Sequence, residues 1–153
     1  MTGGEISDFI RFSYNIKIFK VAVIKLKSMH KLVKNSPLAT FMCGSNIHST
    51  PILTNAGSAG TWDGLDNFHF VVHENVDLSV TLSSKALVIG ACSFTLDQLL
   101  NDTDFKNDRD AMPNKLRYVT KESGLLTIFG DLLDTEGNLT GNIKITFKAK
   151  AMN

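Results

Sequence analysis

The residues around the single tryptophan constrain the fold of this chain most strongly. Trp62 is the only tryptophan in the sequence, and it follows a stretch of small residues at positions 55–60. After it, apolar and mainly polar side chains alternate through residues 67–72, which is the period of a β-strand with one buried face. We therefore expect a turn that delivers Trp62 into a β-structured core as a large apolar plug. Phe68 and Phe70, on the apolar side of the alternation, are expected to share this structural role.

Similar short segments, separated by turn residues, fill the rest of the chain. We expect strands at residues 14–26, 38–43, 47–54, 67–72, 77–82, 86–95 and 141–148, with a bulge near the end of the first, and residues 115–120 and 125–133 supply further strand material. Residues 96–100 suit only a helical turn, and residues 101–114 an acidic surface loop. About eight short strands without a long helix favour an all-β fold, an eight-stranded antiparallel β-sandwich. The domain is expected over residues 14–150, between an N-terminal arm (1–13) and a short C-terminal tail (151–153).

Composition narrows the class of protein. A chain of 153 residues with 43% hydrophobic and 20% charged side chains suits one soluble domain. The formal net charge of +1 gives no overall attraction for nucleic acid. Cys43 and Cys92 lie in apolar runs, which is typical of free buried thiols in a reducing compartment. No basic and apolar leader opens the chain, and no apolar run is long enough to span a bilayer. These features predict a cytoplasmic protein, free or associated with the cytoskeleton or a membrane.

The order of the strand motifs is similar to that of C2 domains over residues 14–150. Residues 21–29 resemble the opening strand and its bulge, and Ser-Pro-Leu-Ala-Thr-Phe at 36–41 stands where the family has Asp-Pro-Tyr-Val. The 60–63 turn, followed by Phe-x-Phe at 68–70, resembles the family's Asn-Pro-x-Trp-Asn-Glu and Phe-x-Phe run. The alternating segments at 78–82 and 141–145 and the Ile-Gly pair at 89–90 complete the resemblance. Gly60-Thr61 replaces the usual proline region and Gly64 the usual glutamate.

The C2 resemblance also locates the loops in which calcium-binding members hold the ion. Those members use carboxylates after the first strand and an Asp-x-Asp element after the fifth, because Ca²⁺ takes about 6–8 oxygen ligands. In this chain the first loop is basic and has no acidic residue, and Ser36 occupies the usual aspartate position. The second loop, which begins at Ser83 and ends at residue 87, contains no acidic residue either. We therefore predict no calcium at the usual C2 site, and no cofactor.

Two other metal patterns are incomplete. The aspartates at 102–110 lack the glycine and distal glutamate of an EF-hand, which favours a solvated acidic loop. His69 and His73 share one strand face, but no further Cys or His is placed to complete a zinc site. They are interpreted as outward-facing or partner-facing side chains.

The sequence contains no recognisable catalytic motif. A glycine-rich phosphate loop and a Gly-x-Ser-x-Gly elbow are both absent from it, so we expect a binding protein and not an enzyme. The C2 resemblance, with its calcium-independent members, implies a protein-binding scaffold subunit of a cytoskeletal, ciliary or trafficking assembly. His69, Val71 and His73 are then the candidate partner-facing residues. Apolar residues at nominally outward positions, Ala22 and Ile24 as well as Val71, favour this interpretation.

The alternative is a peripheral membrane adaptor. Lys25, Lys27, Lys31 and Lys34 form a basic loop at one end of the expected sandwich, with Met29, Leu32 and Val33 between them. Each lysine near an anionic leaflet contributes on the order of 1 kcal/mol, so four give a weak, salt-sensitive attachment to anionic phospholipid without calcium.

Overall fold

A computed structural model describes residues 13–65, 68–73, 75–100, 116–122 and 125–152. The acidic loop expected at 101–114 lies outside these ranges, as does the expected N-terminal arm apart from Ser13. The elements, in chain order, are β1 (Ser13–Ile24), β2 (Pro37–Cys43), β3 (Asn46–Ser49), β4 (Gly60–Trp62), β5 (His69–His73), β6 (Leu78–Ser84), β7 (Leu87–Phe94), α2 (Leu96–Leu100), β8 (Leu116–Glu122), β9 (Leu125–Leu133) and β10 (Leu139–Ala151).

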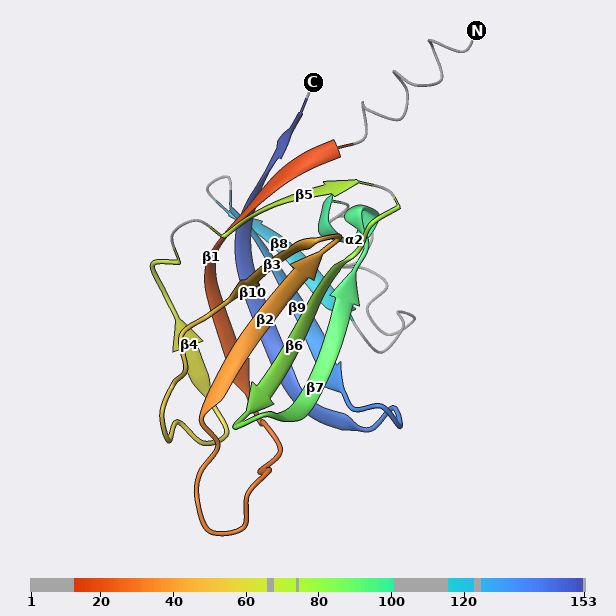
Figure 1. The fold of residues 1–153 in the computed structure, drawn as a ribbon. Coiled ribbons are helices and arrows are strands. Elements are labelled where there is room, and N and C mark those ends of the chain that lie inside the picture. Colours follow the sequence, from red (N-terminus) through yellow and green to blue (C-terminus); the bar gives the residue numbers. More distant parts are fainter. Residues whose placement is uncertain (1–12, 66–67, 74, 101–115, 123–124, 153) are drawn as a thin grey trace, which may run out of the picture.

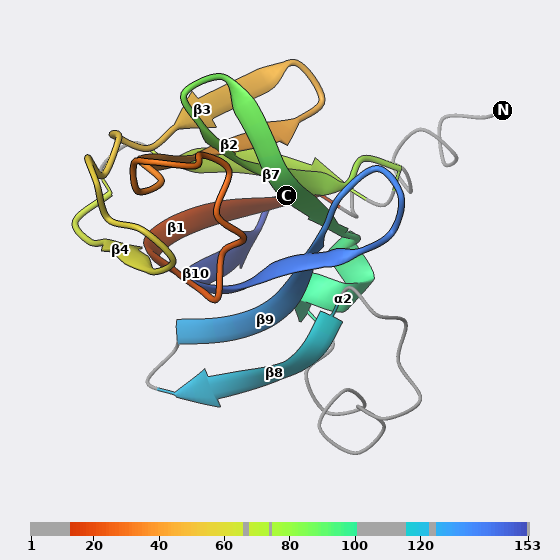
Figure 2. The same cartoon turned by 90° about the horizontal axis from the view of Figure 1, so that it is seen from below.

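The strands form an antiparallel sheet that curls into two layers (Figures 1 and 2). One layer has the order β3-β2-β6-β7, and the other has β9-β10-β1, with β4 and β5 both paired to β1 and β8 to β9. The layers are joined between β7 and β9 at the pair Ala91 and Leu133. The all-β sandwich expected from the sequence is confirmed, with ten strands among the described residues where eight were expected.

The structure differs from the expected strands at three places. Residues 60–62 form the three-residue strand β4, in which Trp62 pairs with Val21 of β1. The strand expected at 47–54 ends at Ser49, before Pro51, which has no N–H to donate to a ladder. The bulge in the first strand lies between Ile18 and Lys20, earlier than expected.

The aromatic residues around the tryptophan turn lie in the core between the layers. Trp62 is 3% exposed, and its indole Nε1 donates a hydrogen bond to the carbonyl of Pro51 at 2.7 Å. Phe68 and Phe70 are buried and both contact the ring of Phe41, at centroid distances of 5.9 and 6.2 Å. This cluster fixes the path of the chain from β3 to β5.

The two ends of the sandwich differ. The start of β1 and the end of β10 lie together at one end, where Met152 N donates to Ser13 O at 3.0 Å. The connection between β1 and β2 extends furthest at the opposite end (Figure 1). No helix among the described residues is long and apolar enough to cross a membrane.

Candidate functional site

The β1–β2 loop, residues 25–36, is held to the sandwich at its base. β1 ends where Lys25 adopts a left-handed conformation with φ of 56°, and Leu26 then turns inward and is 5% exposed. Leu26 N donates to Ser58 O at 2.9 Å, and Lys27 N donates to Thr140 O at 2.8 Å. The loop therefore starts from a fixed point on two neighbouring segments.

A buried asparagine closes the loop internally. Asn35 is 2% exposed, its Nδ2 donates to Lys27 O at 2.8 Å and its Oδ1 accepts from Met29 N at 3.0 Å. Gly57 N donates to Asn35 O at 3.0 Å, which ties the loop to residues 56–58. Because the Asn35 side chain joins the end of the loop to two backbone groups near its start, residues 30–34 are held on a stem braced by hydrogen bonds.

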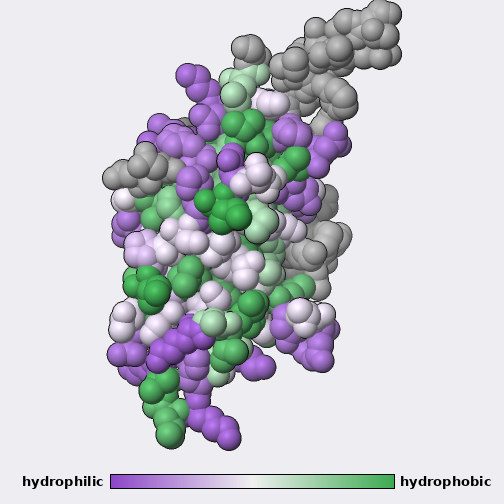
Figure 3. Space-filling model, viewed as in Figure 1, coloured by the Kyte–Doolittle hydropathy of each residue, from purple (hydrophilic) through white to green (hydrophobic). Residues whose placement is uncertain are grey.

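The loop exposes apolar and basic side chains together, from its base at Lys25 and Lys27 to its end at residues 31–34. Leu32 is 97% exposed and Val33 is 48% exposed. Lys25, Lys27, Lys31 and Lys34 are all exposed on the same loop. Together these six residues are called the basic tip below, and Figure 3 shows the apolar atoms at the extremity of the molecule beside hydrophilic ones.

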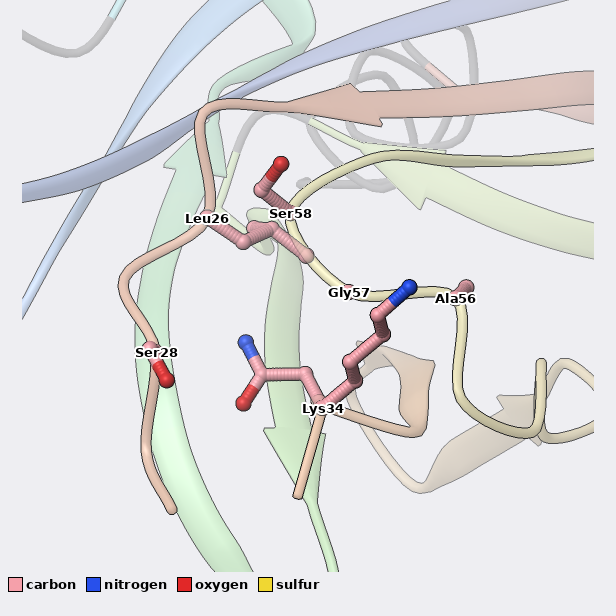
Figure 4. Close-up of a pocket in the computed structure, with 7 residues that line it drawn as sticks. Leu26, Ser28, Lys34, Ala56, Gly57 and Ser58 are labelled. Carbon is pink, nitrogen blue, oxygen red and sulfur yellow. The ribbon is translucent and has the colours of Figure 1, made fainter. Parts of the chain in front are cut away.

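A hollow of about 330 Å³ lies behind the tip, between the stem and residues 56–58. Leu26 and Ser28 line it on the loop side, and the side chain of Lys34 reaches across it toward Ala56 and Gly57 (Figure 4). The hollow therefore has one cationic wall, contributed by the basic tip.

The position where calcium-binding C2 domains have an aspartate is occupied by Ser36, whose hydroxyl is already hydrogen-bonded. Ser36 is buried; its N–H donates to Ser84 Oγ at 2.8 Å and its Oγ accepts from Asn55 N at 3.0 Å. His30 Nε2 lies 2.9 Å from the same Ser84 Oγ. Ser83, the other position considered, lies half-buried on the outer face of β6. Within the described ranges no group of three or more His, Cys, Asp and Glu side chains could hold a metal ion.

One acidic turn lies close to the basic tip. Asp134 Oδ1 accepts hydrogen bonds from the backbone N–H groups of Asn138 and Glu136, both at 2.9 Å. The bond from Asn138 is the largest cause of a lowered pKa of Asp134, and the charge of Lys27 contributes a smaller lowering. Lys27 is thus partly offset by a carboxylate, and we expect Lys31 and Lys34 to carry more of the tip's free positive charge.

The candidate partner-facing residues lie on β5, at a distance from the tip. His69 and Val71 are exposed and His73 is half-buried. Their cross-strand partners on β1 are Lys17, Asn15 and Ser13 respectively, so all three lie on the outer face of the β1 layer. The structure does not bring them together with the four lysines of the basic tip. The two sets of predicted site residues are therefore two separate surfaces.

Sequence reasoning missed a second group of lysines on that same outer face. Lys17 of β1 lies opposite Lys148 of β10, and Lys150 and Lys144 also lie on β10, opposite Asn15 and Ala22. The separation of β1 and β10 in sequence hid this group, although the even spacing of the three β10 lysines was a visible sign. Lys20 is exposed beside these four lysines, and the five together are called the lysine face below.

The outer face of the other layer is uncharged over the strands that the structure describes. The outward positions of β2, β3, β6 and β7 carry hydroxyl, small or apolar side chains, and the middle of this face is mostly white and green in Figure 3. These residues are Leu38, Thr40, Met42, Ile47, Ser49, Ser79, Thr81, Ser83, Val88, Ala91 and Ser93. The two layers thus present opposite kinds of surface, one hydroxyl-rich and neutral and one basic.

Comparison with known proteins identifies the fold. No family model and no curated protein matches this sequence. Among solved structures, the first C2 domain of a plant extended synaptotagmin 1 is 9% identical with a TM-score of 0.58, over 94% of this chain and 97% of that chain. A structure of extended synaptotagmin 2 that holds its SMP domain and two C2 domains is 15% identical with a TM-score of 0.60, over 98% of this chain and 30% of that chain. The two C2 domains of extended synaptotagmin 2 with calcium bound are 14% identical with a TM-score of 0.58, over 96% of this chain and 45% of that chain. The chain has the C2-like β-sandwich that the sequence motifs indicated.

Proposed function

We propose that this protein is a non-enzymatic C2-like module that attaches to anionic membrane surfaces through the basic tip, without calcium. The observation that carries this proposal is the 97% exposure of Leu32 at the end of a braced loop, among exposed lysines. Removing a leucine side chain from water contributes about 1.5–3 kcal/mol, and each lysine near an anionic leaflet about 1 kcal/mol. Together these terms give a weak attachment in which both parts are needed.

The stem of the loop supports attachment without a metal ion. A calcium-binding loop needs inward-pointing carboxylates, whereas Ser36 is hydrogen-bonded to its neighbours and Asn35 already holds the loop closed. The extended synaptotagmin 2 domains with calcium bound have a similar fold. We infer that lysine charge takes the place of a bound cation in this chain.

Liposome co-sedimentation tests the proposal. Vesicles of phosphatidylcholine with phosphatidylserine or phosphoinositide are mixed with the protein at physiological salt, with a chelator and then with calcium. We expect sedimentation that calcium does not increase, and its loss in the triple variant Lys27→Glu, Lys31→Glu and Lys34→Glu.

The matched control changes the same number of charges elsewhere. The triple variant Lys144→Glu, Lys148→Glu and Lys150→Glu carries the identical charge change on β10, so it separates a local effect from a change of net charge. Absence of binding by the parent protein, or an equal loss in the β10 variant, refutes attachment through the tip.

Protein binding in a larger assembly is a second candidate function, favoured by the neutral outer face of β2, β3, β6 and β7. Partner-binding patches have few charges at their centre, and Thr81 lies in the middle of this face, between Thr40 and Ala91. An arginine at position 81 would place a charge there. In cells that express the Thr81→Arg variant, the native mass of the complex that contains this protein should fall. Lys85→Arg is the control and should leave the mass unchanged. An unchanged mass with Thr81→Arg argues against binding through this face.

A further inference from the structure

The lysine face brings together charges that are far apart in sequence. Lys17 and Lys148 are directly opposed on neighbouring strands, an arrangement that is unfavourable between like charges. Lys150 and Lys144 continue the positive charge along β10, and Lys20 adds to it from β1. Positive charge is therefore concentrated on the outer face of β1 and β10.

Aromatic rings hold several of these ammonium groups against the sheet. The Nζ atoms of Lys17 and Lys148 lie 5.0 and 5.9 Å from the centre of the Phe19 ring. Lys144 Nζ lies 5.9 Å from the centre of the Phe129 ring. Such contacts favour a cation over a ring face. They orient the lysines but supply no negative charge to balance them.

Few carboxylates oppose this charge among the residues that the structure describes. Asp63 lies at the margin, with its Oδ1 3.9 Å from Lys20 Nζ. Asp131 is 6% exposed and accepts a hydrogen bond from Asn142 Nδ2 at 2.7 Å. The other lysines of the face form no ion pair within the described residues.

The shape of this surface indicates the kind of anion that it fits. Lys144, Lys148 and Lys150 lie along one strand, so the row is about 20 Å long at a rise of about 3.3 Å per residue. The charges do not converge on one point, as they would for a single phosphate. His69, Val71 and His73 lie on β5, which is separated from this row by β1. A row of this length matches about six residues of an extended chain.

We propose that the lysine face is a docking site for an extended acidic polypeptide segment. Electrostatic complementarity along the row would select a run of Asp and Glu residues, with Val71 offering an apolar contact on the far side of β1. A bilayer is a poorer match, because the strands run away from the basic tip and the lysine face lies on the side of the sandwich (Figure 1). A nucleic acid is a poorer match too, since lysine side chains lie over the rings of Phe19 and Phe129, on which bases would otherwise stack. The proposal goes beyond membrane attachment and does not depend on it.

Fluorescence anisotropy with a labelled peptide of eight glutamates tests the proposal on the full chain. We expect binding that weakens as salt is raised and no binding of the matched eight-glutamine peptide. The double variant Lys17→Glu and Lys148→Glu should raise the Kd for the peptide by about tenfold or more. Each change removes one attraction to the peptide and adds one repulsion, so four charge interactions of a few tenths of a kcal/mol each are altered. The double variant Lys31→Glu and Lys34→Glu, with the same net charge, should bind the peptide like the parent.

Each arm has an outcome that overturns the proposal. Equal loss in the two double variants would show a net-charge effect, and unchanged binding in the lysine-face variant would place the site elsewhere. Tighter binding of a single-stranded oligonucleotide, or loss of vesicle binding in the lysine-face variant alone, would assign the face to nucleic acid or to a membrane. If the glutamate variant does not fold by circular dichroism, Lys17→Gln with Lys148→Gln should show a smaller loss in the same direction. Membrane attachment by the tip could fail in the vesicle assay while the peptide result stands, and the reverse also holds.

Discussion

Changing Leu32 to alanine should separate membrane binding from folding. At 97% exposure the side chain makes almost no contribution to the core, so the free energy of unfolding should change by less than about 0.5 kcal/mol. If the tip enters a bilayer, the change removes about three carbon groups from the buried surface. At about 0.8 kcal/mol each, the loss is about 2 kcal/mol, which corresponds to about a 30-fold weaker partition.

The assay is a lipid titration by co-sedimentation, paired with thermal denaturation. Ile47→Ala is the matched control, because Ile47 is 56% exposed on β3 and is not part of the basic tip. We expect the control to bind vesicles like the parent protein. An unchanged partition of Leu32→Ala would refute tip insertion, and a large fall in its melting temperature would refute the claim that Leu32 lies free of the fold.

Three further predictions concern the sandwich that holds these surfaces. Trp62→Phe should lower the free energy of unfolding by about 1–2 kcal/mol, since the Pro51 carbonyl loses its indole donor; an unchanged urea midpoint would contradict this. Gly90→Ala should destabilise by about 1–3 kcal/mol, because the added Cβ would overlap Thr140 Oγ1, and Ser93→Ala on the same strand serves as its control. The lowered pKa of Asp134 means that its ionised form stabilises the fold above the ordinary value of 3.8. This stability should be lost as the pH falls through the lower pKa of the folded protein, and the loss should be absent in acid melts of Asp134→Asn.

The fold could be predicted because period-2 alternation reports burial on each strand independently. Phe68, Phe70 and Val72 all lie in the core for this reason. Pairing partners were harder to predict, because a register depends on contacts between distant segments. The strand β4 has only three residues, which is too short to show an alternating sequence pattern. It is recognised only through its pairing with β1, in which Trp62 lies opposite Val21.

The same limit explains which site features the sequence could indicate. Lys25, Lys27, Lys31 and Lys34 are neighbours in the chain, so the basic tip was visible as a composition shift. Lys17 and Lys148, in contrast, lie near opposite ends of the sequence and become neighbours only through the β1–β10 register.

The interior of the β1–β2 loop explains why we expect the proposed membrane binding to respond to salt and not to calcium. The polar groups nearest the expected ion position, on Asn35, Ser36 and Ser84, already hydrogen-bond each other or the backbone. An ion entering there would have to displace these bonds and would find no carboxylate on the loop to replace them. The lysines, in contrast, lie exposed on the outside, where their attraction to a negative surface is screened over about 8 Å at physiological salt. If the tip attaches to a membrane as we propose, we therefore expect it to do so without an ion, with ionic strength setting how strongly the protein is bound.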